Sequence, residues 1–304
     1  MTRYLLLVLS LLLPVTLASP AAAQVVGKKK VVKLDIDLSE YKTKHYLIEY
    51  ESVIPKSTVE KIGKELEDIL EQYVRLFRAK PKEPLHVLFM DSQNTFEQVG
   101  GKPSVAGFYS RGPVEIEAGK KRRAARYLFI RQAPFYELVS TTYHEAFHQY
   151  LDMYVGFKAE TPIWFDEGMA SYFEEMQRDP GGGKNRKLNP KRIDKRKLRM
   201  VKSAVTTRTH IPLEKLIDAR YEEFHDKSDK STEALYYGQS FSVICFFMEK
   251  TEGRAIVAFM KTLKNKPKEP EAAHAKLFGK DRKNVKKVEA MWKDYLRRVK
   301  LPRK

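Results

Sequence analysis

The segment from residue 136 to residue 155 constrains the fold of this chain more than any other, because its apolar side chains recur every three or four residues. That spacing predicts an amphipathic helix with one buried face. His144, Glu145 and His148 form an H-E-x-x-H motif beside the apolar stripe. Histidines four residues apart lie on nearly the same face of a helix, so both imidazoles can reach one metal ion. The stripe consists of Val139, Tyr143, Ala146, Phe147, Tyr150 and Tyr154.

The motif by itself leaves an alternative open, in which the two histidines are surface or capping residues of an ordinary helix. With seven histidines in 304 residues, a random H-E-x-x-H arises in roughly one of a hundred such sequences. A second segment, residues 161–174, supplies a further acidic residue. Thr161 and Pro162 are typical of a helix start, and Glu167 follows on a short helix that can fold back across the first.

Two imidazoles and one carboxylate leave a fourth coordination position for water, which is typical of catalytic rather than structural zinc. Nitrogen ligands favour zinc over calcium or magnesium, which bind mostly oxygen. Asp166 competes with Glu167 for the role of acidic ligand. Glu145 lies next to the metal-facing edge of the helix, where it could take a proton from metal-bound water.

Residues 144–168 resemble a known kind of zinc site. His144-Glu145-x-x-His148, followed after eighteen residues by Glu167, is similar to the zinc-site pattern of gluzincin metallopeptidases. The resemblance implies that His144, His148 and Glu167 bind zinc and that Glu145 is the general base. It also makes Glu167 preferable to Asp166 as the acidic ligand.

The resemblance continues downstream. The motifs at 211–216, 236–243 and 291–295 are similar to secreted bacterial proteins with a "peptidase MA-like" domain, a family whose substrates are mostly unassigned. The family implies an α+β fold in which a thermolysin-like catalytic lobe combines a small mixed sheet with the active-site helix. An edge strand would lie beside the cleft, and a mainly helical C-terminal lobe would follow.

Peptide hydrolysis also needs a donor aimed at the developing oxyanion. In the aminopeptidase branch of gluzincins, a tyrosine ahead of a Y-x-x-G-like helix has this role, which points to Tyr237, with Tyr236 as the near alternative. Both aromatic residues could instead pack this helix against the core. His210 and His225 are further donor candidates, although unpaired histidines in polar surroundings are more often surface residues.

The sequence departs from the gluzincin pattern at two places. Thermolysin-like members have an aspartate four residues after the glutamate ligand, where it orients a zinc-bound imidazole. This chain has Ser171 there, and Asp152, one turn beyond His148, is the residue that could substitute. The G-x-M-E-N stretch with which aminopeptidases hold a substrate's N-terminus is absent from the sequence. Its absence favours cleavage within an extended peptide over aminopeptidase activity.

The N-terminal residues indicate export. Arg3 precedes a short apolar run from Tyr4 to Ala18, and small residues follow as far as Ala23. A positive start, a short apolar run and an A-x-A pattern predict a Sec-type signal peptide over residues 1–23, with an uncleaved anchor as the alternative. The run is shorter than the roughly 20 residues of a membrane span. We therefore expect a periplasmic, cell-envelope or extracellular protein with no transmembrane helix after cleavage.

Hydrophobic patterning predicts the remaining elements. Strands are expected at 45–50, 85–90, 106–110, 113–117 and 127–131, and a helix at 57–78. This order is typical of a small mixed sheet with helices on it. The single cysteine, Cys245, lies in an apolar run and is expected to be a buried, inert thiol. The expected divisions are a leader at 24–40, an α/β lobe at 41–176 with both the H-E-x-x-H helix and the third-ligand helix, a basic Gly-containing loop at 177–202, and a helical lobe at 203–304.

The formal net charge of +18 predicts attraction to polyanions. Eleven lysines and arginines lie between Arg178 and Lys202. This stretch is either a solvated loop or a docking site for an anionic cell-envelope polymer.

Two functions are therefore compatible with the sequence. The first is an exported zinc-dependent peptidase that hydrolyses peptide or protein substrates through a metal-activated water, with a glutamate as general base. The alternative is a basic secreted binding protein on a peptidase-like scaffold, which engages anionic surfaces or polymers without catalysis. An intracellular nucleic-acid-binding protein is disfavoured by the predicted signal peptide and by the lack of a recognition motif.

Overall fold

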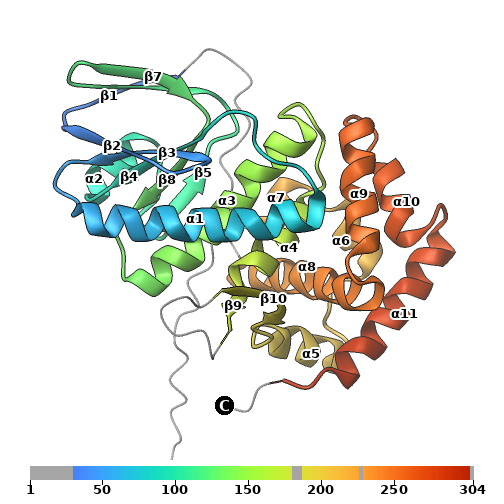
Figure 1. Ribbon diagram of the computed structural model, residues 1–304. Coiled ribbons are helices and arrows are strands. Elements are labelled where there is room, and N and C mark those ends of the chain that lie inside the picture. The colour runs from blue at the N-terminus through green and yellow to red at the C-terminus, as the bar shows by residue number, and fades with distance from the viewer. Residues whose placement is uncertain (1–29, 180–186, 226–228, 302–304) are drawn as a thin grey trace, which may run out of the picture.

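The computed structural model describes residues 30–179, 187–225 and 229–301. The N-terminal part combines strands with a few helices, whereas the C-terminal part is mostly helical (Figure 1). The predicted signal peptide lies outside the described residues. The strands are β1 (Lys30–Leu34), β2 (Leu38–Lys42), β3 (Tyr46–Glu51), β4 (Leu85–Met90), β5 (Gly107–Tyr109), β6 (Val114–Ala118), β7 (Lys121–Ala125), β8 (Tyr127–Arg131), β9 (Met176–Arg178) and β10 (Leu188–Ile193). The helices are α1 (Lys56–Phe77), α2 (Gln93–Gln98), α3 (Phe135–Val155), α4 (Ile163–Glu174), α5 (Leu198–Thr207), α6 (Leu213–Asp218), α7 (Tyr221–Phe224), α8 (Lys230–Thr251), α9 (Arg254–Asn265), α10 (Pro270–Phe278) and α11 (Arg282–Arg298).

The predicted mixed α+β architecture is confirmed. Five strands form the sheet against which the helices pack, in the order β2-β3-β4-β8-β5. The three central strands are parallel, and the two edge strands, β2 and β5, are antiparallel to their neighbours. A second, three-stranded sheet has the order β1-β6-β7. The edge strand β5 packs against α3, so this edge of the larger sheet lies beside the helix with the H-E-x-x-H motif.

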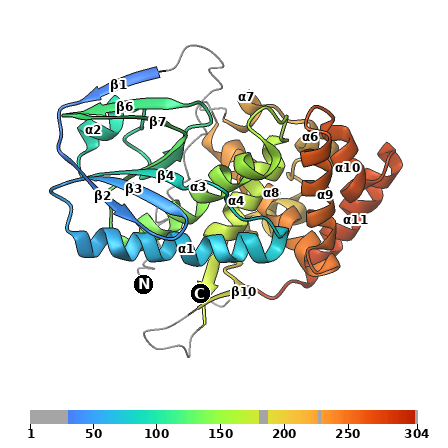
Figure 2. The same ribbon diagram turned by 45° about the horizontal axis from the view of Figure 1, so that its top comes forward.

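The larger sheet is buried on both faces. Along β4, Val87 and Phe89 belong to a core shared with the helices, whereas Leu88 and Met90 belong to a smaller core shared with the three-stranded sheet. This alternation arises because successive side chains of a strand point to opposite faces. Figure 2 shows the resulting layers, with α1 on one side of the larger sheet and β1, β6 and β7 on the other.

Some strands were not expected from the sequence. The predicted leader at 24–40 contains β1 and begins β2. β1 pairs in parallel with β6, so that Lys30 lies opposite Val114. A partner so distant in the sequence leaves no local pattern from which the pairing could be read. Within the predicted basic loop, β9 and β10 form an antiparallel pair and α5 begins.

α4 occupies a central position among the helices, because it packs against both α3 and α8. Its residues Trp164, Phe165 and Met169 are buried in the larger core. Cys245 of α8 is buried there as well, as the apolar run predicted, and burial raises the pKa of its thiol. Within the described part of the chain, no helix combines the length and the apolar character needed to cross a membrane.

Candidate metal centre

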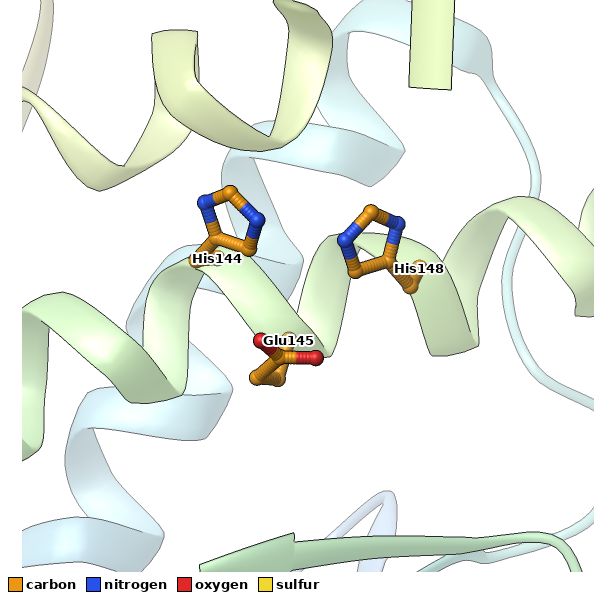
Figure 3. Close-up of side chains that lie close together, drawn as sticks. All are labelled: His144, Glu145 and His148. Carbon is orange, nitrogen blue, oxygen red and sulfur yellow. The ribbon is translucent and has the colours of Figure 1, made fainter. Parts of the chain in front are cut away.

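α3 presents the H-E-x-x-H residues to the interior of the protein. The helix begins after Pro134 and ends at Gly156, whose φ of 90° is a conformation that favours glycine. His144, Glu145 and His148 are all buried. The two imidazoles lie on the same side of α3, with ring centroids 5.0 Å apart, and Glu145 lies beside them (Figure 3).

α4 brings Glu167 to the two histidines. Its Oε2 atom is 3.2 Å from His144 Nε2 and 3.7 Å from His148 Nε2. The same nitrogen of each ring therefore faces one carboxylate oxygen, and Glu167 is buried with them. The tertiary structure thus brings together the three residues that the sequence analysis selects as ligands.

Glu145 is also close enough to share an ion with the histidines. One of its oxygens and one nitrogen of each imidazole lie within 4.8 Å of one another. Two buried atoms, Glu145 Oε1 and His148 Nε2, have no hydrogen-bond partner within the described residues. Buried polar atoms rarely lack a partner, and these are a carboxylate oxygen and an imidazole nitrogen. The donor set therefore fits a divalent cation, and the identity of the metal is not fixed by this geometry.

The second nitrogen of His148 is held by Asp166. His148 Nδ1 is 2.6 Å from Asp166 Oδ1, and the other oxygen of Asp166 accepts from Arg111. An ionised carboxylate can only accept, so this contact places a proton on Nδ1 and leaves Nε2 able to bind a metal. Asp152, named above as the residue that could substitute as the orienting group, instead contacts Arg111, with its Oδ1 3.9 Å from Arg111 Nε.

His144 is held in the same way by Glu174. His144 Nδ1 is 3.2 Å from Glu174 Oε2, and Lys197 donates from Nζ to that oxygen at 3.0 Å. Glu174 follows Glu167 by seven residues, which is about two turns, so both carboxylates lie on the same face of α4. Ser171, which stands where the gluzincin pattern has its orienting aspartate, is not the residue that bonds His144 Nδ1; Glu174 makes that contact.

Burial and neighbouring charges give three carboxyl groups of the centre, those of Glu145, Glu174 and Asp166, different pKa values. Burial raises the pKa of Glu145 to about 7, although the adjacent histidines oppose this. Burial would also raise the pKa of Glu174, but Lys197 and the bonded imidazole outweigh it and lower that pKa to about 2. The pKa of Asp166 is lowered despite its burial, because it lies between an imidazole and a guanidinium. Glu145 is therefore the carboxyl of the three that can exchange a proton near neutral pH.

Tyr237 lies in the interior near the two glutamates. Its hydroxyl is 3.3 Å from His225 Nδ1. Burial raises its pKa well above 10, and the negative charges of Glu167 and Glu145 contribute to that rise. Tyr236, the alternative donor, packs its ring against Phe224 with centroids 4.9 Å apart.

His225 differs from its expected surface position, because it is buried between α7 and α8. Its Nε2 atom has no hydrogen-bond partner within the described residues. Burial lowers its pKa, and Glu167 and His148 act on it electrostatically, which places the ring near the centre. The other donor candidate, His210, is instead paired with Glu289 at 3.2 Å. Sequence reasoning missed the position of His225 because only the packing of α7 on α8 buries it.

A cavity of about 740 Å³ adjoins the centre. Arg111, Asp166 and Glu167 form the part of its wall nearest the histidines. Acidic groups outnumber basic ones in the rest of the described lining, which contains a single lysine or arginine, Arg220. These acidic lining residues are Glu160, Asp218, Glu222 and Glu271.

Part of the basic stretch 178–202 pairs with acidic residues of the same chain. Arg178 bonds both Glu65 and Asp68, and Lys197 contacts Glu174 at the candidate centre. These cations hold β9 and α5 to the rest of the protein. Residues 180–186 of the stretch lie outside the described residues, and its docking to an anionic polymer stays a prediction.

A sequence model of the family described as "Protein of unknown function (DUF1570)" matches residues 138–269. The match runs from α3 through α9. It therefore includes His144, Glu145, His148, Glu167 and Tyr237. The family's description names no activity. No curated protein matches the chain.

Proposed function

We propose that this protein is a zinc-dependent peptidase of the gluzincin type. The observation that carries the proposal is the approach of one Glu167 oxygen to the Nε2 atoms of both histidines. Two imidazoles and one carboxylate are the ligands of many catalytic zinc sites, and they leave a position open for water or substrate. His144, His148 and Glu167 would hold the ion.

When bound, zinc would supply Lewis acidity, which polarises a scissile carbonyl and lowers the pKa of water towards about 7. Glu145 is suited to receive the proton of an attacking water, because its pKa of about 7 lets it accept and release a proton near neutrality. The backbone N–H of Tyr109 donates to Glu145 Oε2 at 3.0 Å and so fixes the carboxylate beside the histidines. Glu145 would then pass the proton to the leaving amine.

Tyr237 is the proposed donor to the developing oxyanion. Its hydroxyl is buried close to both glutamates, and donors placed in a water-poor site stabilise such charge strongly. His225 supports Tyr237 through the contact at 3.3 Å.

The proposed substrate is an extended peptide cleaved internally. The edge strand β5 ends at Tyr109, directly beside Glu145, so a peptide bound next to the end of this strand would lie at the candidate centre. The cavity next to Glu167 would receive side chains of the substrate. Its wall carries an excess of carboxylates, which favours lysine or arginine over acidic side chains.

Export is part of the proposal and is supported by the sequence alone. The N-terminal pattern of residues 1–23 is that of a signal peptide. Peptide substrates outside the cytoplasm or in the cell envelope would then be the ones that the protein meets.

The test combines zinc content with hydrolysis of casein and of a peptide library that contains basic, neutral and acidic residues. We expect Glu145→Gln to retain stoichiometric zinc and to lose activity by at least about 10²-fold, because only proton transfer is removed. His148→Ala should lose the zinc, while the matched control His210→Ala should retain it. Full hydrolysis by Glu145→Gln would eliminate the mechanism. Zinc binding by the wild type without turnover of any peptide would favour the basic binding protein on a peptidase-like scaffold.

A further inference from the structure

A second cavity, of about 940 Å³, lies along the C-terminal part of α3. Its wall is built from that part of α3 and the residues after it, the start of β4 with the segment before it, the end of β7 with Arg126, Tyr109 at the end of β5, and one residue of α9. None of its described lining residues lines the cavity next to Glu167. The two cavities are therefore separate candidate sites.

Two buried acceptor atoms at this cavity, one on Gln149 and one on Asp152, have no hydrogen-bond partner within the described residues. Gln149 is 3% exposed, and its Nε2 donates to the backbone oxygens of His86 at 2.9 Å and Arg126 at 3.3 Å. These bonds fix the amide, so that Oε1 is the free end, and Oε1 has no partner within the described residues. Asp152 is 8% exposed; Arg111 and the Tyr109 hydroxyl interact with its carboxylate, while the Oδ2 atom has no hydrogen-bond partner within the described residues. Leaving buried acceptors unpaired is unfavourable, so both call for donors such as hydroxyl groups.

The charged residues around the same cavity are mostly basic and therefore favour an anionic group in the ligand. Four of them are basic, and Glu83 is the only acidic residue of the described lining besides Asp152. The Arg126 guanidinium lies 4.1 Å from the centroid of the Phe157 ring, and Lys264 Nζ lies 4.8 Å from the centroid of the Tyr154 ring. The rings keep these two cations at the wall of the cavity. The basic lining residues are Lys80, Lys82, Arg126 and Lys264.

We propose that this cavity binds a hydroxylated sugar that carries a carboxylate or a phosphate. Sugar hydroxyls would donate to Gln149 Oε1 and Asp152 Oδ2, and the anionic group would lie among the lysines. A simple anion such as inorganic phosphate has no carbon-bound hydroxyls to donate to the two acceptors while its charge lies among the lysines. A cationic peptide is repelled by the lysines. A neutral sugar satisfies the acceptors but gains nothing from the positive charge.

Calorimetric titration of the full chain tests this proposal with four probes. Glucose 6-phosphate and glucuronate carry both hydroxyls and a charge, whereas glucose lacks the charge and inorganic phosphate lacks the carbon-bound hydroxyls. We expect at least one charged sugar to bind about tenfold more tightly than either control, since each type of contact contributes independently. The comparison between the two charged sugars shows whether a phosphate or a carboxylate is preferred. Equal binding of inorganic phosphate and both charged sugars, or no binding of any probe, would overturn the proposal.

Substitutions in the wall of this cavity test whether the sugars bind there. Gln149→Met removes the free acceptor while keeping a side chain of similar length, and we expect about tenfold weaker binding of the charged sugars. Because Gln149 is buried, the fold of this variant is checked by circular dichroism. The double variant Lys82→Gln/Lys264→Gln changes two exposed residues. It should weaken binding of the charged sugars and leave binding of glucose unchanged, and this test remains usable if Gln149→Met fails to fold. Lys261→Gln, a matched change on α9 outside the cavity, should have no effect. An equal loss in Lys261→Gln would show that only net charge matters and would overturn the proposal. The readout is binding, so it does not depend on whether the protein hydrolyses peptides.

Discussion

Each imidazole of the candidate centre is fixed through its Nδ1 atom, His144 by Glu174 and His148 by Asp166. Each of these carboxylates is in turn paired with a buried or half-buried cation, Lys197 or Arg111. The cations keep the carboxylates ionised, and the carboxylates keep the proton on Nδ1. At the scale of single residues, four charged groups that are not among the proposed ligands therefore fix the orientation of the two imidazoles.

Asp166→Asn and Glu174→Gln should each lower zinc affinity by about 10–100-fold, because each removes the acceptor that orients a ligand imidazole. The measurement is competition with a chromogenic chelator at constant pH. Ser171→Ala is the matched control, since this buried residue of α4 occupies the position at which the gluzincin pattern places the orienting group. A larger loss in Ser171→Ala than in Glu174→Gln would contradict the observed hydrogen bonding.

Tyr237→Phe should lower the rate of peptide hydrolysis by about 10²–10³-fold, because it removes a single hydroxyl donor to the oxyanion. Zinc content should remain unchanged, since the hydroxyl is not one of the ligands proposed here. Tyr236→Phe, one position earlier on α8, should retain nearly full activity. Comparable rates for wild type and Tyr237→Phe would remove this tyrosine from the mechanism.

At the scale of elements, the closeness of α4 to α8 decides where Glu167 lies. Gly168, the next residue, allows this approach, because a Cβ atom there would lie 2.9 Å from the backbone oxygen of Ser240 and 2.9 Å from Ile244 Cγ1. Backbone atoms cannot move aside as a side-chain end can. A larger residue at this position would push α4, and Glu167 with it, away from α8.

Gly168→Ala should therefore destabilise the protein by about 1–3 kcal/mol, through overpacking between two helices. Its zinc affinity should fall as well, since α4 carries Glu167, the proposed acidic ligand. Urea denaturation gives the first quantity, and chelator competition gives the second. Gly238→Ala on α8 is the control, because its nearest contact is Met200 Cε, the end of a flexible side chain. A Gly168→Ala protein as stable as wild type would show that α4 can move away from α8 without a loss of stability.

At the scale of the whole molecule, α4 connects the C-terminal helices to the candidate metal centre. Trp164 Nε1 donates to His274 Nε2 of α10 at 3.1 Å, and both residues belong to the boundary between these helices. Burial lowers the pKa of His274 to about 4, although the charges of Asp218 and Glu271 oppose this. His274 is therefore neutral in the folded protein at pH 6, while its unfolded counterpart, with a pKa of 6.5, is already mostly protonated.

This difference predicts how stability depends on pH. Between about pH 6.5 and pH 4 the unfolded chain binds more protons at this position than the folded protein, so the free energy of unfolding falls as the pH is lowered. His274 should contribute roughly 2 kcal/mol to that fall. Comparing urea denaturation of wild type and His274→Gln at pH 7 and pH 4.5 isolates the contribution. The variant should be less stable at pH 7 and lose less stability on acidification; parallel losses would contradict the assignment.

Patterns that arise within one element could be predicted from the sequence. The boundaries of β4 and β8 follow directly from their apolar runs, and the spacing of four residues places His144 and His148 on one side of α3 because a helix turns about 100° per residue. β1 and β7 were missed because their residues are charged or mixed in character, and their strand pairing depends on β6. Polar strands of this kind are specified by their partners rather than by their own periodicity.

The sequence by itself determined the mixed α+β class, the helix that carries the histidines, and the short list of acidic residues that could join them. Only the tertiary structure decided which acidic residue does what: Glu167 faces both Nε2 atoms, while Asp166 and Glu174 hold the Nδ1 atoms in place of Asp152 and Ser171. The physical reason is that spacing within a helix fixes the direction of a side chain relative to its own axis. Which atom it meets depends on how α4 packs between α3 and α8, and that packing is set by contacts far apart in the chain.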